Sequence, residues 1–390
     1  SDILGGLTPS FFYGMKIGII GKGLSGILTA LMWRVHHPEV EIEVFYDKSV
    51  PTEPVGSGSW PNLLQLLRDV SNSYPQYNND WNNSLWQSTP KVAIRYEGWG
   101  EKDSWAHGFS YSHTAMHFDP KEFQDYFCNS DIFNVTEKHV EYDDIDADYI
   151  YDCAGYPKDY SDCYILRNPL NKVLLSNLPP SFDEKSIFTR TVATPDGWCF
   201  VIPLKNRVSL GYLYNDLITS DEVAEDNFKE QFGVVDIFNK ISFKNYCSKN
   251  PVIDDRIFLN GNKYFFIEPL EATAIYSYMN WISRTMEAIY HRIPFKDIVD
   301  INQKLINDNA DFILKHYSYG SKYNTPFWDY AKKLTVDNPQ LDDIIIRSTY
   351  GNWSNLNNEG YSYYNVESIL QMHYNMIGYD YHSLRLSKWV

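Results

Sequence analysis

The sequence has no run of 18 or more apolar residues, few basic residues for its length and few cysteines. The missing apolar run predicts that no helix spans a membrane. Lys and Arg number 34 against 50 Asp and Glu, a formal net charge of −16, which argues against nucleic-acid binding because that requires clustered positive charge. The five cysteines are scattered without a CxxC pair, as is typical of reduced thiols in a cytoplasmic protein. We therefore predict a cytoplasmic protein that binds neither nucleic acid nor membranes.

The amino-terminal region has the order of elements that is typical of nucleotide-binding units. These are an apolar strand pattern at Met15–Ile20, the GxGxxG turn Gly21–Gly26, helical spacing over Leu24–His36, a second strand at Val40–Tyr46, and Asp47. The glycines allow backbone to approach a pyrophosphate, the helix N-terminus attracts the anion, and the acidic residue binds ribose hydroxyls. The pattern predicts a dinucleotide cofactor of unspecified kind; the alternative is an ordinary strand–helix turn.

The remaining patterns predict an α/β fold, with a Rossmann-like three-layer module, an antiparallel sheet and a helical C-terminal part. The strand signals are Lys91–Trp99, a buried strand at Asp148–Gly155 that ends in small residues, an antiparallel pattern over Ile187–Leu213 with a turn at Asp196-Gly197, and Tyr264–Ile267. The helix signals are a helix capped by Asp119 and begun by Pro120, a long helix opened by Glu268–Glu271, and helices at Ile298–Tyr317, Pro326–Lys333, Pro339–Ser348 and Val366–Met376. His113 and His117 lack a third ligand, so we predict no metal site.

Several separated segments resemble one family, the flavin-dependent halogenases of the tryptophan-halogenase type. Beside the glycine turn they are Pro90–Tyr96, Ala106–Phe109, Met116–Asp119, Asp152–Tyr156, Gly197–Leu204, Gly211–Tyr214, Ile267–Ile275, His316–Tyr317 and Asn324–Trp328. They follow the family's order. The family's WxWxIP signature, which keeps substrate away from flavin, is present as Trp198, Phe200, Ile202 and Pro203. Phe replaces the second Trp, and we expect the barrier to persist.

The resemblance implies FAD, supplied as FADH2, together with O2 and halide ion, and a reaction that makes hypohalous acid. Lys91 corresponds to the lysine that carries or polarises the electrophilic halogen. Glu271 corresponds to the acidic residue that orients the electrophile or assists loss of the ring proton. Thr273 and Ala274 match the positions whose backbone amides hold halide, although the family usually has Gly at the second.

The same resemblance implies the residues that contact substrate and cofactor. His107 and Phe109 match substrate-stacking positions. The expected flavin contacts are Gly21, Gly23, Leu24, Ser25, Gly26, Asp47, Gly58, Ser59, Gly155, Glu268 and Pro269. The loop Gly58-Ser59-Trp60 replaces the family's usual Gly-Glu-Ala/Ser-Thr, which leaves the gating of flavin open.

Each of these roles has a plainer alternative. Lys91 could cap a strand at the surface, and Glu271 could be favoured by the dipole in the first turn of a helix. His107 and Phe109 could pack within an aromatic loop. For the whole chain, the alternatives are an FAD-dependent aromatic monooxygenase, which hydroxylates, and a flavin-binding protein without turnover.

Departures from the family bear on the substrate. Much of the segment between the His107 region and Met116 is missing, and the C-terminal part is abbreviated. The resemblance therefore predicts an open site for an aromatic or heteroaromatic small molecule other than free tryptophan. The compact form is also similar to small halogenases found in phage genomes.

The chain offers one nucleotide motif, which FAD would use, so a separate flavin reductase is the expected partner; a homo-oligomer is left open. We expect a flavin-binding, monooxygenase-like module over residues 15–347 with interleaved cofactor and substrate segments. An abbreviated helical extension would cover 348–390, and residues 1–14 would be an added segment ahead of a natural start at Met15.

Overall fold

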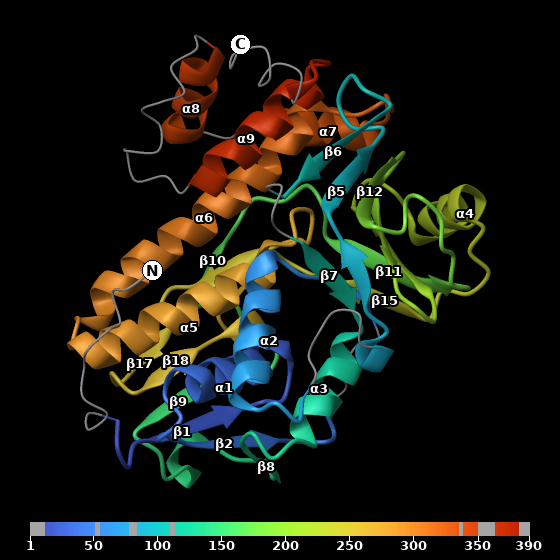
Figure 1. The fold of residues 1–390 in the computed structure, drawn as a ribbon. Coiled ribbons are helices and arrows are strands. Elements are labelled where there is room, and N and C mark those ends of the chain that lie inside the picture. Colours follow the sequence, from blue (N-terminus) through green and yellow to red (C-terminus); the bar gives the residue numbers. More distant parts are fainter. Residues whose placement is uncertain are drawn as a thin grey trace, which may run out of the picture. The chain divides into compact units, whose positions relative to one another are not determined.

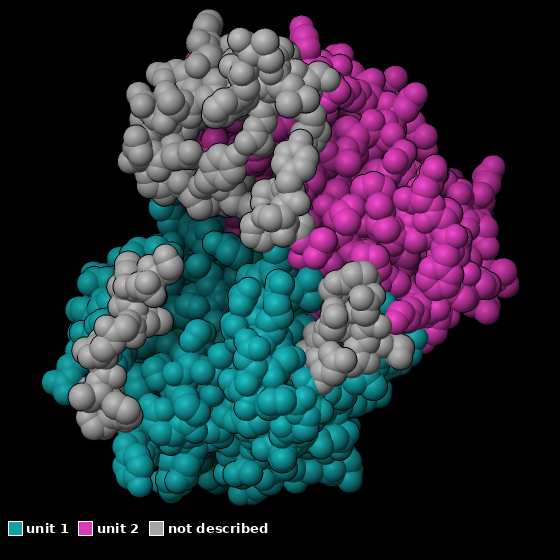
Figure 2. Space-filling model, in the orientation of Figure 1, with its two compact units in different colours: residues 1–88, 118–165, 245–306 teal, residues 89–117, 166–244, 307–390 magenta. Residues whose placement is uncertain are grey.

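A computed structural model describes residues 12–50, 55–77, 84–109, 114–334, 338–349 and 363–381. The chain divides into two compact units, coloured separately in Figure 2. Unit 1 comprises Ser1–Ser88, Phe118–Ile165 and Asn245–Ile306, and unit 2 comprises Thr89–His117, Leu166–Lys244 and Asn307–Val390. Each unit is thus assembled from three separate segments of the chain. The domain bounds expected from the sequence, 15–347 and 348–390, stay a prediction.

Unit 1 is built on a six-stranded sheet with the order β17-β18-β9-β1-β2-β8 (Figure 1). All its neighbouring strands run parallel except the β17–β18 pair. The strands are β1 (Lys16–Ile20), β2 (Glu41–Tyr46), β8 (Asn134–Glu137), β9 (Tyr149–Asp152), β17 (Val252–Ile253) and β18 (Ile257–Leu259). The central strand β1 is apolar because both of its faces are covered, as is usual in a parallel sheet.

Helices cover one face of this sheet. The helices of unit 1 are α1 (Leu24–His36), α2 (Pro61–Ser73), α3 (Pro120–Cys128) and α5 (Thr273–His291), with short 3₁₀ helices at Ser84–Trp86, Tyr142–Asp144 and Gly261–Lys263. The indole of Trp33 on α1 meets the ring of Tyr151 on β9 edge-on, with centroids 6.4 Å apart, and α1 also packs against α5. Unit 1 has further strands at β3 (Ser57–Gly58), β10 (Cys163–Ile165), β16 (Tyr246–Ser248) and β19 (Phe265–Phe266).

Unit 2 contains a seven-stranded sheet with the order β15-β11-β14-β13-β12-β5-β6. Its neighbouring strands are antiparallel except for the parallel pair of β12 and β5. The strands are β5 (Ala93–Glu97), β6 (Ser104–Gly108), β11 (Lys172–Leu178), β12 (Phe188–Thr194), β13 (Gly197–Pro203), β14 (Val208–Tyr214) and β15 (Asn239–Ser242). The helix α4 (Asp221–Phe232) packs Phe228 against Cys199, Val201 and Tyr212 on one face. Since side chains alternate along a strand, Trp198, Phe200 and Ile202 lie on the opposite face.

The C-terminal part is helical. Its helices are α6 (Phe295–Tyr319), in which the boundary between the units falls, α7 (Pro326–Lys333), α8 (Pro339–Thr349) and α9 (Tyr363–Met376). An apolar cluster joins α8 to α9 through Ile344 and Leu370. None of the helices in the described ranges is long and apolar enough to cross a membrane. The predicted α/β class, with its Rossmann-like module, antiparallel sheet and helical C-terminal part, is confirmed.

Two expected elements differ from the structure. The strand predicted at Lys91–Trp99 is two strands, because the chain leaves β4 (Thr89–Lys91) at Val92 and enters a different sheet as β5. β4 pairs instead with β7 (Ala115–Phe118). The helix predicted to open at Glu268 begins only at Thr273. A turn closed by a hydrogen bond from the Ala272 amide to the Pro269 carbonyl, 3.0 Å long, precedes it.

Candidate functional site

The three glycines of the turn between β1 and α1 have different structural roles. Gly21 has a positive φ of 99°, which favours glycine. A Cβ at Gly26 would lie 2.0 Å from the Gly21 carbonyl oxygen, so only glycine lets α1 approach the turn this closely. At Gly23 a Cβ would meet no atom within 4 Å. The turn therefore leaves open space beside Gly23, at the N-terminus of α1.

This helix start is suited to an anion. Gly23 is the N-cap and supplies no side chain to the first amides, and the first turn carries no acidic residue. The N–H groups of Leu24, Ser25 and Gly26 are thus presented as in phosphate-binding turns. The Ser25 side chain is buried and faces Gly261, so any contact that Ser25 makes with a cofactor would come from its amide.

Asp47 follows β2, next to the end of β1. Its carboxylate accepts a hydrogen bond of 2.8 Å from the Ser49 amide and lies 3.3 Å from Nδ1 of His139. Hydrogen bonds from Ser49 hold the pKa of the Asp47 carboxyl below its ordinary value. An ionised, half-exposed carboxylate at this edge of the sheet can accept from ribose hydroxyls. The residues of unit 1 therefore fit a dinucleotide such as FAD.

The other expected flavin contacts differ in their burial and in the space beside them. Gly155, just after β9, has a φ of 69° and open space where a Cβ would be. Gly58 ends β3, whereas Ser59 is fully buried. The next residue, Trp60, packs its ring 6.1 Å from that of Tyr276 on α5, so the loop that departs from the family is anchored to a helix.

The segment before α5 forms a second uncapped helix start. Ala272, the N-cap, has the left-handed φ of 53° that non-glycine residues rarely adopt, and neither a capping side chain nor an acidic residue serves the first turn. The amides of Thr273 and Ala274 are therefore oriented as donors to an anion. Glu271 lies just before this first turn and is buried, and its role stays a prediction.

Glu268 and Pro269 differ in exposure. The Glu268 side chain is buried and its amide donates to Oδ1 of Asn245 over 3.0 Å, whereas Pro269 is exposed. Their roles as flavin contacts stay a prediction.

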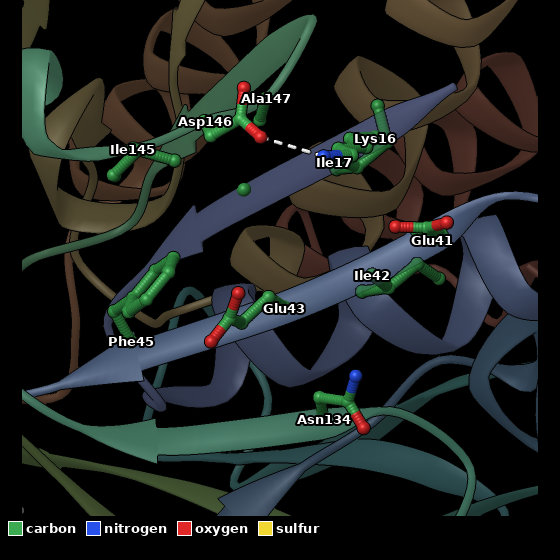
Figure 3. A pocket seen from close by; sticks show the side chains of 11 residues that line it. Lys16, Ile17, Glu41, Ile42, Glu43, Phe45, Asn134, Ile145, Asp146 and Ala147 are labelled. Carbon is green, nitrogen blue, oxygen red and sulfur yellow. Dashed lines mark hydrogen bonds and ion pairs between the residues drawn. The ribbon is translucent and has the colours of Figure 1, made fainter. Parts of the chain in front are cut away.

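A shallow pocket lies on another part of unit 1 (Figure 3). It is lined by residues near the beginnings of β1 and β2, and an ion pair of 2.6 Å between Lys16 and Asp146 crosses it. The glycine turn follows the opposite, carboxyl ends of these strands, where ligands of parallel α/β sheets bind. We therefore assign this pocket no part in the site.

In unit 2, Lys91 is fully buried at the end of β4. The surface alternative for this lysine is therefore wrong. Its ammonium lies 5.6 Å from the centre of the Phe109 ring, within the range of a cation–π contact. The Phe109 amide donates to the carbonyl of Val92 over 3.3 Å, which ties the aromatic residue to the backbone beside the lysine. The structure thus brings together two residues that the resemblance assigned to different tasks.

The signature strand β13 presents Trp198, Phe200 and Ile202 on one face, with Trp198 and Phe200 in edge contact at 6.4 Å between ring centroids. Phe200 pairs with Gly211 on β14, and a Cβ there would lie 2.1 Å from the Phe200 ring. Glycine thus makes room for the aromatic residue that replaces the second Trp. Pro203 ends the strand, and its carbonyl accepts a hydrogen bond of 2.6 Å from the Thr89 hydroxyl.

His107 lies on β6 and is buried. Its Nε2 is 3.1 Å from the hydroxyl of Ser368 on α9. On the next residue, the amide of Gly108 donates to Oε1 of Gln371 over 3.1 Å. The ring of His107 is therefore held by the C-terminal helix, which the sequence did not indicate. Whether it stacks on a substrate stays a prediction.

Comparison with known proteins identifies the family of this chain. The tryptophan halogenase family model matches residues 16–155 and 170–378. The chain belongs to the tryptophan halogenase family. This membership confirms the resemblance drawn from the separated motifs.

Individual relatives are distant. The chain is 23% identical over 224 residues to tryptophan 7-halogenase RebH of Lentzea aerocolonigenes, covering 51% of this chain and 41% of that enzyme. It is 25% identical over 264 residues to tryptophan 7-halogenase KtzQ of Kutzneria sp., covering 56% and 48%. The matched part thus spans less than half of the length of these curated relatives.

Solved halogenases share the fold. BrvH, a flavin-dependent halogenase from Brevundimonas sp. BAL3, superposes with a TM-score of 0.74 at 16% identity, over 96% of this chain and 94% of its own. Tryptophan 6-halogenase SttH from Streptomyces toxytricini gives 0.71 at 17% identity, over 85% and 84%. At such identities the likeness extends to the fold and not to the individual site residues.

Sequence reasoning missed several residues of the candidate site. Thr89 and Ser368 were not singled out. Gly211 appeared only within a matched segment, and His117 appeared within another matched segment and as a possible metal ligand. An alternation signal was available for Thr89, since it lies two residues before Lys91 and so shares a face of the strand. Within the described ranges no cluster of His, Cys, Asp or Glu could hold a metal ion; His113 lies outside them.

Proposed function

We propose that the chain is a flavin-dependent halogenase. FADH2, O2 and halide would give hypohalous acid, and Lys91 would pass the halogen to an aromatic or heteroaromatic small molecule other than free tryptophan. The observation that carries the proposal is a wholly buried lysine held beside an aromatic ring, in a chain whose other unit has a turn fit for a dinucleotide. A structural lysine would not need to be buried, because desolvating an ammonium group is costly.

Different residues of the chain would serve different steps of this reaction. The amides that begin α1, with Asp47, would hold FAD, and the flavin supplies the oxidising chemistry when bound. The amides of Thr273 and Ala274 would hold halide. The Lys91 ammonium would hydrogen-bond hypohalous acid and polarise its halogen. A carbon–halogen bond then replaces an aromatic C–H bond, and the ring proton leaves with the hydroxyl of the acid as water, with Glu271 assisting its removal. A separate flavin reductase would supply FADH2.

The test is mass spectrometry of phenols, indoles, anilines and tryptophan incubated with enzyme, FADH2, O2 and chloride or bromide. We expect a halogen-dependent mass shift on at least one substrate other than tryptophan. The Lys91→Ala variant should lose about a hundredfold or more of this product while still oxidising FADH2 and releasing hypohalous acid. Hydroxylated product without halide would favour the monooxygenase instead, and reaction of tryptophan alone would refute the substrate class.

A further inference from the structure

His117 is a fully buried histidine that the proposed chemistry does not use. It lies on β7, directly opposite Thr89 on β4. Its Nδ1 is 3.0 Å from the Thr89 hydroxyl, and its Nε2 is 3.0 Å from the hydroxyl of Thr189 on β12. Both ring nitrogens are thus bonded within unit 2, each to a threonine of a different strand.

The hydrogen bonds determine which nitrogen carries the proton. The single hydrogen of the Thr89 hydroxyl is donated to the carbonyl of Pro203 over 2.6 Å. The Thr89 oxygen can therefore only accept from His117, which places the imidazole proton on Nδ1. Nε2 is then an acceptor, and it takes the hydroxyl hydrogen of Thr189. The neutral ring with its proton on Nδ1 satisfies every one of these groups.

This hydrogen-bond network lies where it can hold β4, the strand that carries Lys91. β4 has three residues and separates from β5 at Val92, so its backbone ladder is short and its position depends on side-chain anchors. Thr89 is the anchor, and Lys91 follows it by two residues on the same face of the strand. Through Thr89 the strand of the lysine is fastened to Pro203, the last residue of the barrier strand β13.

We propose that His117 is a positioning residue for Lys91, which fixes β4 against the end of β13 through Thr89. The geometry of this network does not depend on the proposed halogenase function, but its consequence for halogen transfer rests on that function. If β4 shifts, the ammonium loses its place relative to the substrate, and hypohalous acid escapes instead of being transferred. A displacement of about 1 Å is enough to reduce a reaction rate by about a hundredfold.

Two variants of His117 separate its two hydrogen bonds. In His117→Asn the amide nitrogen lies where Nδ1 was and still donates to Thr89. In His117→Gln the side-chain oxygen can replace Nε2 as acceptor for Thr189, but the donor to Thr89 is lost. Thr89→Val removes the anchor hydroxyl at nearly unchanged volume. We expect His117→Asn to behave as wild type within about threefold, and the other two variants to share one defect.

The first measurement is the ratio of halogenated product to hypohalous acid released, the latter trapped by a thioether that it oxidises to the sulfoxide. This ratio should fall about tenfold in His117→Gln and in Thr89→Val, with FADH2 oxidation unchanged, and the double variant should be no worse than either. Parallel loss of product and hypohalous acid in these variants would indicate general damage to the fold and would overturn the inference.

The second measurement does not depend on turnover. Reductive methylation by formaldehyde, followed by peptide mass spectrometry, reports how readily the buried Lys91 amine is reached. Its rate should rise about tenfold in His117→Gln and Thr89→Val but not in His117→Asn. If wild type produced no halogenated compound and this pattern still appeared, the proposed function would fail and the positioning role would stand. Equal methylation rates in all variants would refute the positioning role.

Discussion

The glycine turn of unit 1 and the lysine strand of unit 2 position their functional groups by opposite means. The turn makes its site from backbone amides of one continuous segment, Gly21–Gly26, and needs no side chain. β4 places Lys91 with side chains from β7 and β12 and a backbone carbonyl at the end of β13, which lie far apart in the sequence. The first kind of site is therefore specified locally, and the second only by the folded unit. Substitutions should damage them differently.

The largest effect is expected in the turn itself. In Gly26→Ala the new Cβ would lie 2.0 Å from the Gly21 carbonyl oxygen, and a backbone atom cannot move aside cheaply. We expect a loss of about 3 kcal/mol in the free energy of unfolding, measured by urea denaturation, and loss of FAD binding. Gly23→Ala is the matched control, since its Cβ enters open space at an ordinary φ of −61°.

Gly23→Ala should therefore fold as stably as wild type and yet bind FAD about tenfold more weakly or worse, because the methyl group occupies the space that the pyrophosphate needs. Fluorescence titration with FAD measures this directly. Unchanged affinity in Gly23→Ala would show that the cofactor does not approach this turn.

The two regions were also unequally predictable. The bounds of α1 agree with those drawn from the sequence, Leu24–His36, because apolar spacing and a glycine turn are local signals. The strand of Lys91 is held through Thr89 and His117, whose partners Pro203 and Thr189 lie 114 and 72 residues away along the chain, and no local pattern can pair them. The late start of α5 was also missed, for a local reason. Pro269 favours a helix start, but it begins a turn here, and Ala272 takes up the strain.

The lysine region should respond to pH in a way that the turn does not. Burial, and then the positive charge of Lys91, lower the pKa of His117 well below its ordinary value. Below about pH 6.5 the unfolded chain protonates this residue while the folded protein does not, so stability falls as the pH falls. Between pH 6.5 and 5.0 this costs at most about 2 kcal/mol.

Urea unfolding at pH 7.5 and 5.0 measures this cost. The difference between the two pH values should be smaller in His117→Asn than in wild type, by up to about 2 kcal/mol. His373 of α9 is the control histidine, since burial also lowers its pKa, though less far, and His373→Asn should remove a smaller part of the difference. An identical pH dependence in wild type and His117→Asn would contradict a buried neutral ring.

The smallest effect concerns the start of α5, an uncapped helix start like that of α1 that is reached through a strained alanine instead of a glycine. Ala272 has a φ of 53°, which costs an alanine about 1 kcal/mol, whereas Ala274 lies in the first turn of the helix. Ala272→Gly should therefore raise the free energy of unfolding by about 0.5 kcal/mol, and Ala274→Gly should lower it by about 0.5–1 kcal/mol. Both can be measured by urea denaturation.

Opposite signs from the same substitution two residues apart would locate the strain at Ala272. Since both variants keep their amides, the halide dependence of product formation should stay unchanged in each. If Ala272→Gly were instead as destabilising as Ala274→Gly, the left-handed turn would not be the means by which the chain presents these amides.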